Sequence, residues 1–161
     1  MEWTVLHVRP KCEKKMAGHC AAHSIDHYLP LRRETKVYQR RKVIVDKPVF
    51  PGYVFADVPK AQRLTVLKSS NLVRIIDVLA QERFVREIEQ VRQALQVDAT
   101  LGATAAIQSG KPVRITAGPF QGLEGVVVTA RGVTRVVLNI NMIGQGVRVD
   151  VDADMLELID A

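Results

Sequence analysis

The chain has 161 residues and a formal net charge of +6, which favours an anionic partner without naming one. Apolar residues make up 47% of it and charged residues 25%, which is the composition of a globular protein of one domain or two small ones. The sequence contains no apolar run long enough to cross a membrane, and a charged residue at position 2 argues against a signal peptide, so we expect a cytoplasmic protein.

The first elements in chain order are a strand and a helix. Residues 3–8 alternate and are rich in strand formers, and Arg9-Pro10 ends this strand. A helix is predicted from Lys11 to about Ser24. The residues expected on its buried face are Cys12, Met16, Ala17, Cys20 and Ala21. Eight residues of helix separate the two cysteines by ~12 Å, too far for a disulfide, so we expect reduced thiols.

His19 and His23 are four residues apart on the predicted helix, a spacing that can hold a metal ion. His7 and His27 are the only other histidines, and no acidic or cysteine ligand completes a known pattern. We therefore interpret both as surface or half-buried histidines, and we expect neither a metal nor another cofactor.

The next segment predicts a basic hairpin. Residues 28–38 form an extended strand broken early by Pro30, residues 39–42 form the tip, and residues 43–45 return. Between residues 32 and 47, seven Lys and Arg side chains stand against two acidic ones. One interpretation is a solvated edge that blocks aggregation. The other is an arm that contacts phosphates, and the excess of arginine over lysine favours nucleic acid.

Residues 49–55 hold three aromatic residues around a break. Pro51-Gly52 is a turn or bulge signal inside an otherwise apolar strand run. Tyr53 and Phe55 share one face of the strand that follows, because side chains alternate. Phe55 is predicted to lie in the core. For Phe50 and Tyr53 a core position and an exposed partner-binding patch both stay open.

The remaining elements of the first part are helix, strand and helix. A second helix opens after Pro59 with Ala61, Leu64 and Leu67 predicted to face inward, and residues 72–78 form a strand. The apolar stripe of a third helix consists of Phe84, Ile88, Val91 and Leu95. Strands and helices do not alternate regularly, so we predict an α+β fold, an antiparallel sheet with flanking helices, over residues 1–97.

The texture changes after the third helix. Residues 98–109 are mostly small and polar, which predicts a flexible linker. Residues 110–161 then contain five short strands separated by glycine-rich turns, which predicts a small, partly open β-barrel. The expected strands are 113–115, 125–128, 135–140, 146–151 and 155–159. No nucleophile–base pair, phosphate loop or metal cluster is found in the sequence, so we expect no enzymatic activity.

Two motifs together carry a family resemblance. Gly110-Lys111-Pro112-Val113-Arg114-Ile115, followed by Gly118-Pro119-Phe120-Gln121-Gly122-Leu123-Glu124-Gly125-Val126, resembles a KOW motif. Phe50-Pro51-Gly52-Tyr53-Val54-Phe55 resembles the signature of the NusG amino-terminal domain. Over essentially the whole chain, the sequence is similar to NusG and its specialised paralogs such as RfaH. The resemblance implies an SH3-like KOW barrel after the linker, and a bacterial, monomeric transcription elongation and antitermination factor.

The resemblance also implies sites. The amino-terminal domain would bind the clamp helices of RNA polymerase through His7, Phe50, Tyr53 and Phe55. The non-template DNA strand or nascent RNA would meet basic residues, namely Arg9, Lys11, Arg32, Arg33, Lys36, Arg40, Arg41, Lys42 and Arg74. The barrel would bind a small-subunit ribosomal protein or the termination factor Rho through Phe120, Leu123, Met142 and Ile143. The family's Phe-Gly-Arg is Ile143-Gly144-Gln145 here, which favours a specialised antiterminating paralog.

The alternative interpretation is a KOW-type RNA-binding protein of the ribosome or of translation. Binding to ribosomal RNA does not require an apolar aromatic patch, and it should weaken steeply with salt. These two features separate it from a polymerase-binding factor.

Overall fold

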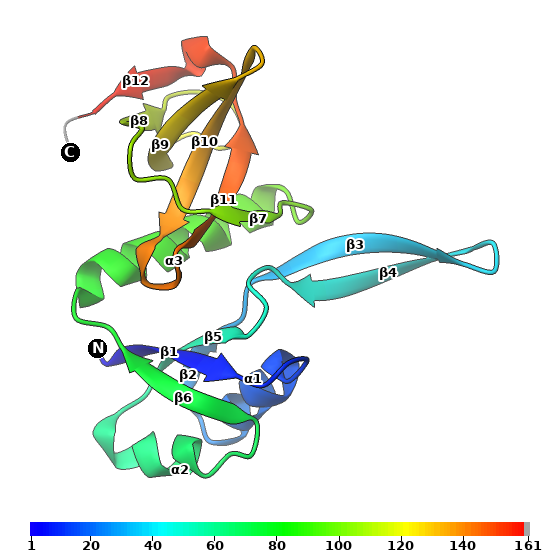
Figure 1. Cartoon of the computed structure of the whole chain (residues 1–161), viewed down its shortest axis with the longest axis vertical. Coiled ribbons are helices and arrows are strands. Elements are labelled where there is room, and N and C mark those ends of the chain that lie inside the picture. The colour runs from blue at the N-terminus through cyan, green and yellow to red at the C-terminus, as the bar shows by residue number, and fades with distance from the viewer. Residues whose placement is uncertain (160–161) are drawn as a thin grey trace. The chain divides into compact units, whose positions relative to one another are not determined.

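The computed structural model describes residues 1–159 and contains two compact units, each described here by itself (Figure 1). The first unit consists of Met1–Leu31 and Pro48–Val85, and the second of Arg32–Lys47 and the chain from Arg86 onward. Positions 160–161, the end of the predicted second domain, lie outside the described residues.

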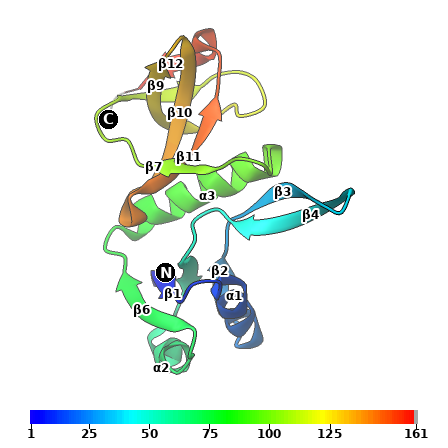
Figure 2. The same ribbon diagram turned by 45° about the vertical axis from the view of Figure 1, so that its right-hand side comes forward.

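The first unit is built on a four-stranded sheet with helices α1 and α2 on one face (Figures 1 and 2). Its strand order is β2-β5-β1-β6, and each neighbouring pair is antiparallel. The predicted α+β architecture with an antiparallel sheet is therefore confirmed. The elements are β1 (Trp3–Val8), α1 (Glu13–Ala22), β2 (Asp26–Tyr28), β5 (Tyr53–Asp57), a 3-10 turn η1 (Lys60–Gln62), α2 (Arg63–Leu67) and β6 (Leu72–Asp77).

The core under α1 and α2 follows the predicted stripe of the first helix only in part. Met16 and Cys20 are fully buried against the sheet, but Ala21 is exposed. The prediction for the second helix is wrong, because Leu64 and Leu67 are 62% and 53% exposed and Val66 is the buried residue. The 3-10 turn between Pro59 and α2 shifts the helical phase, so the stripe could not be extrapolated from the proline.

The opposite face of this sheet carries aromatic residues. Val5 pairs with Phe55 in the β1–β5 ladder, and Phe84 from the first turn of α3 (Gln81–Val97) packs edge-on against Phe55 at 5.4 Å. The Gln81 side chain accepts the Trp3 N–H and donates to the Trp3 carbonyl, which ties the start of α3 to β1. All four residues of the stripe predicted for the third helix are buried, which confirms it.

Strands β3 (Leu31–Tyr38) and β4 (Arg41–Pro48) form a two-stranded sheet of their own in the second unit. The hairpin predicted from the sequence is confirmed, but its turn is only Gln39–Arg40. Both turn residues have positive φ, 47° and 67°, the geometry of a two-residue turn that matches the twist of the strands.

Besides the hairpin and the part of α3 from Arg86 onward, the second unit contains a six-stranded sheet in the order β12-β8-β9-β10-β11-β7. The five predicted strands of the barrel are all found, and the β-rich region fits a KOW domain. Their bounds are β8 (Lys111–Ile115), β9 (Glu124–Ala130), β10 (Val133–Ile140), β11 (Gln145–Asp150) and β12 (Leu156–Leu158), with 3-10 turns η2 (Asn141–Ile143) and η3 (Ala153–Met155).

Part of the segment predicted to be a flexible linker is paired with the sheet. Strand β7 (Ala103–Ala105) pairs with β11, and the Asn139 side chain bonds the N–H and the carbonyl of Ile107 at 3.0 and 2.7 Å. The Gln90 side chain of α3 likewise bonds both backbone groups of Glu124 in β9. Small residues suggested a linker, but backbone pairing along a sheet edge needs no large side chain.

Candidate functional site

Three adjacent strands of the first unit place Tyr53, His7 and Arg74 in one row on the aromatic face of the sheet. The ladders pair His7 with Tyr53 of β5 on one side and with Arg74 of β6 on the other. The rings of His7 and Tyr53 are stacked, with centroids 5.5 Å apart and planes at 29°. Both are partly exposed, and Arg74 is exposed. The row therefore offers a partner an aromatic pair beside a cation.

Unlike the residues of this row, Phe50 and Phe55 are buried. They are 1% and 0% exposed, and their rings are 6.3 Å apart. The core position predicted for Phe55 is confirmed, whereas the alternative of an exposed Phe50 is wrong. The turn after Phe50 folds its ring back against Phe55, so that burial of a large apolar side chain outweighs its place beside a break. Of the four aromatic candidates, Tyr53 and His7 are the two that can touch a partner.

The turn at Pro51-Gly52 immediately precedes β5, which begins at Tyr53. Gly52 has a φ of +90°, a conformation that side chains rarely adopt. Its carbonyl accepts the Val8 N–H at 2.8 Å, and its N–H donates to Oε2 of Glu13 at 2.8 Å. Glu13 is 5% exposed, and sequence reasoning missed it. An acidic residue in the first turn of a helix is common enough that nothing in the pattern marked it as buried.

The predicted nucleic-acid residues fall into two groups. Arg9, Lys11 and Arg74 belong to the first unit, and all three are exposed. The Arg9 N–H donates to the carbonyl of Asn71 at 2.8 Å, which attaches the loop before α1 to the start of β6. The other six belong to the hairpin: Arg32, Arg33, Lys36, Arg40, Arg41 and Lys42.

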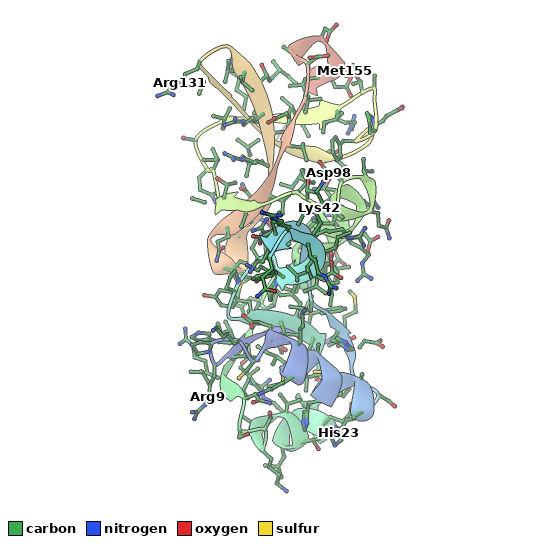
Figure 3. All side chains as sticks on the ribbon, turned by 90° about the vertical axis from the view of Figure 1, so that its right-hand side faces the viewer. Arg9, His23, Lys42, Asp98, Arg131 and Met155 are labelled. Atoms are coloured by element: carbon green, nitrogen blue, oxygen red, sulfur yellow. The ribbon has the colours of Figure 1, made fainter. Side chains whose placement is uncertain are left out.

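Charge on the hairpin is paired at its base and unpaired at its tip. Glu34 bonds Arg32 and Lys47, both at 3.1 Å, and the hydrogen bond from Lys47 lowers the pKa of Glu34. Arg33 lies 3.8 Å from Asp46. Around the turn, by contrast, the side chains of Arg40, Arg41 and Lys42 form no ion pair within residues 1–159, and Figure 3 looks onto this end with Lys42 labelled.

The four barrel candidates do not form one group. Phe120 lines a cavity of about 620 Å³ together with Val133, Thr134 and Met155. Met142 and Ile143 lie in η2, which follows the carboxyl end of β10, and Met142 is 38% exposed. Leu123 is 4% exposed and belongs to the barrel core, so the expectation that it faces a partner is wrong.

The histidine pair contacts protein groups, and the two cysteines do not form a disulfide. The rings of His19 and His23 are 4.4 Å apart, and a ring nitrogen of His19 lies 3.2 Å from the Thr65 carbonyl oxygen. Residues 1–159 contain no group of three side chains placed to hold a metal ion. Both thiols are free, and burial raises the pKa of the Cys20 thiol to about 11.

The family model described as transcription termination factor NusG matches residues 1–118. The chain belongs to the NusG family. A solved structure on domain interaction in Thermotoga maritima NusG is 21% identical with a TM-score of 0.52, covering 99% of this chain and 97% of that one. This likeness supports a NusG-like fold.

Two structures of the MjSpt4:Spt5 complex, conformations B and A, are 16% and 14% identical, with TM-scores of 0.31 and 0.30. They cover 99% and 98% of this chain and 97% of each of those chains. Comparison with curated protein sequences gives no significant match.

Membership of the NusG family places the chain among transcription elongation, antitermination and regulatory factors, which are not enzymes. Within residues 1–159, none of the helices has the length and apolar character needed to span a membrane.

Proposed function

We propose that this NusG-family chain is a transcription elongation and antitermination factor that binds the clamp helices of RNA polymerase through Tyr53 and His7. The observation that carries the proposal is the stacked Tyr53–His7 pair, which is partly exposed on a sheet face where Phe55 is buried. Aromatic side chains held rigidly and half exposed are typical anchors of protein interfaces. Arg74, in the same row, suits an acidic group at the edge of the partner surface.

The test is the affinity of Tyr53→Ala for RNA polymerase core enzyme. Loss of a central aromatic anchor should weaken binding by about 2 kcal/mol, roughly thirtyfold. Tyr53→Phe should keep most of the affinity, because the stacked ring remains. Val73→Ala is the control, since Val73 is 54% exposed on β6 of the same sheet. Unchanged affinity in a folded Tyr53→Ala variant would remove this face from the proposal.

The hairpin tip is the part of the chain best suited to nucleic acid. Its three cations form no ion pair within residues 1–159, so contact with phosphates would break no existing ion pair, and the base of the hairpin keeps a positive excess of its own. We therefore propose that Arg40, Arg41 and Lys42 contact the non-template DNA strand or nascent RNA, with Arg9 and Lys11 adding charge on the first unit.

The barrel would act as a second binding module, for a small-subunit ribosomal protein or Rho, with Met142 and Ile143 at the contact. The predicted division into residues 1–97, 98–109 and 110–161 is kept as a proposal for the functional domains. The alternative of a KOW-type ribosomal or translational RNA-binding protein accounts for the barrel but not for the family match over residues 1–118.

A further inference from the structure

Glu13 is the only charged side chain that is buried within residues 1–159. Charged side chains are almost never buried unless they are paired, because removing a charge from water is unfavourable. The start of α1 offsets part of this penalty, since a carboxylate is stabilised by the exposed N–H groups there. An apolar residue at this place would avoid the penalty altogether. The burial of Glu13 therefore calls for a role other than filling space.

The carboxylate of Glu13 is bonded to the backbone of the turn that precedes β5, the strand that carries Tyr53. Oε2 accepts the N–H of Gly52 at 2.8 Å, while the Gly52 carbonyl accepts the N–H of Val8 at 2.8 Å. The turn is closed by the Tyr53 N–H, which donates to the Phe50 carbonyl at 3.2 Å. Gly52 is thus held on one side by α1 and on the other by β1.

A glycine needs such restraint more than any other residue. With no Cβ, Gly52 has the widest choice of backbone conformations, and its φ of +90° is only one of them. Tyr53 follows directly, so a rotation of the peptide before Gly52 would change the direction in which β5 starts. The Tyr53 ring would then leave its stacked position on the His7 ring. The hydrogen bond to Glu13 is made in the turn conformation in which the two rings are stacked.

We propose that Glu13 is a positioning residue for the partner-binding face: through Gly52 it fixes Tyr53 against His7 in the conformation that binds RNA polymerase. This role rests on the proposed function of the Tyr53–His7 pair. It is distinct from that function, because Glu13 itself is buried and does not reach the partner.

The experiment compares Glu13→Ala, Glu13→Gln and Met16→Ala in the full chain. Met16 is fully buried on the same helix and has no bond to the turn, so Met16→Ala controls for a general loss of stability. Each variant is assayed for affinity to RNA polymerase core enzyme at a temperature where it is folded. Amide and ring NMR signals of Gly52, Tyr53 and His7 are recorded in parallel.

We expect Glu13→Ala to weaken polymerase binding by about tenfold or more, because the anchor geometry is lost, while Met16→Ala stays close to the unmodified chain. Glu13→Gln should restore most of the affinity, since its amide oxygen can accept the Gly52 N–H. The Gly52 amide and the Tyr53 and His7 ring signals should move in Glu13→Ala and not in Met16→Ala. If Glu13→Ala does not fold, Glu13→Asp gives the same test, because its shorter side chain cannot reach Gly52.

Two results would overturn the proposal in distinguishable ways. Equal affinity in Glu13→Ala and Met16→Ala, alongside a loss in Tyr53→Ala, would refute the role of Glu13 and leave the partner-binding face in place. Full affinity in Tyr53→Ala would refute the face and, with it, the role of Glu13.

Discussion

Gly125 of β9 lies tightly against strand β10 of the barrel, and replacing it with alanine should destabilise the second unit. A Cβ at this position would lie 2.5 Å from the Val137 carbonyl oxygen and 2.7 Å from Cγ1 of Val136. The carbonyl belongs to the backbone of a paired strand, so it cannot rotate away as a side chain could. Overpacking of this kind costs about 3 kcal/mol of unfolding free energy.

Two other glycines separate crowding from backbone strain. Gly122 has a φ of +95° but no atom within 4 Å of an added Cβ, so Gly122→Ala should cost about 1–2 kcal/mol through strain alone. Gly102 has neither a neighbour within 4 Å nor a positive φ. Gly102→Ala should therefore be neutral or stabilise by about 0.5 kcal/mol, because alanine restricts the unfolded chain.

The assay is urea unfolding followed by amide NMR signals of residues 111–159. Fluorescence of Trp3 is unsuitable, because this only tryptophan of the chain belongs to the first unit. The expected order of loss is Gly125→Ala, then Gly122→Ala, then Gly102→Ala. A Gly125→Ala barrel that loses no more stability than the Gly122→Ala barrel would refute the crowding argument.

Four further predictions concern the Cys20 thiol, the hairpin and the barrel. In Cys12→Ser, a disulfide reagent should label the remaining Cys20 only at the rate of unfolding, because its thiol is buried and its pKa is about 11. Burial raises that pKa above its value in the unfolded chain, so the neutral thiol contributes its full stability at neutral pH. This contribution to the free energy of unfolding falls as the pH rises towards 11, and the pH dependence should be absent in Cys20→Ala. Reversal of Arg40 and Arg41 to Glu should reduce nucleic-acid-dependent recruitment but spare binding to free polymerase; equal loss of both would assign the hairpin to protein contacts. Residues 105–159 should give strand-type NMR shifts both in isolation and in the full chain, because their β-branched runs and glycines disfavour helix; helical shifts in the full chain would contradict this.

Long-range periodicity made much of the fold predictable. An apolar stripe from Phe84 to Leu95 predicts the third helix, and every residue of the stripe is buried. Alternating apolar and polar residues, together with turns that contain glycine, predict the barrel strands. Val147 and Val149, which are two residues apart in β11, are both fully buried. In each case one physical requirement, an apolar face on a regular element, is repeated often enough to fix both the type and the phase of the element.

In two short elements, α2 and β7, no pattern repeats often enough to fix the type and the phase of the element. Helix α2 has only five residues after a 3-10 turn, so a shift of one residue decides whether Leu67 or Val66 is buried. Strand β7 has three residues, Ala103–Ala105, whose place is set by backbone pairing to β11. Composition records side chains and says little about backbone partners, which is why this segment was predicted to be a linker.

The candidate site shows the same division at the level of single residues. The sequence predicts a core position for Phe55 but leaves Phe50 and Tyr53 open, and the structure separates these two, with Phe50 buried and Tyr53 partly exposed. Phe50 and Phe55 are buried, so truncating either to alanine should lower stability by about 3–5 kcal/mol and reduce binding only through unfolding. Tyr53 is partly exposed on His7, so its truncation should act on affinity. The turn at which β5 begins is bonded through the Gly52 N–H to Glu13, which lies on a helix some forty residues earlier. A signature read along the strand alone therefore contains the anchors but not the contact that orients them.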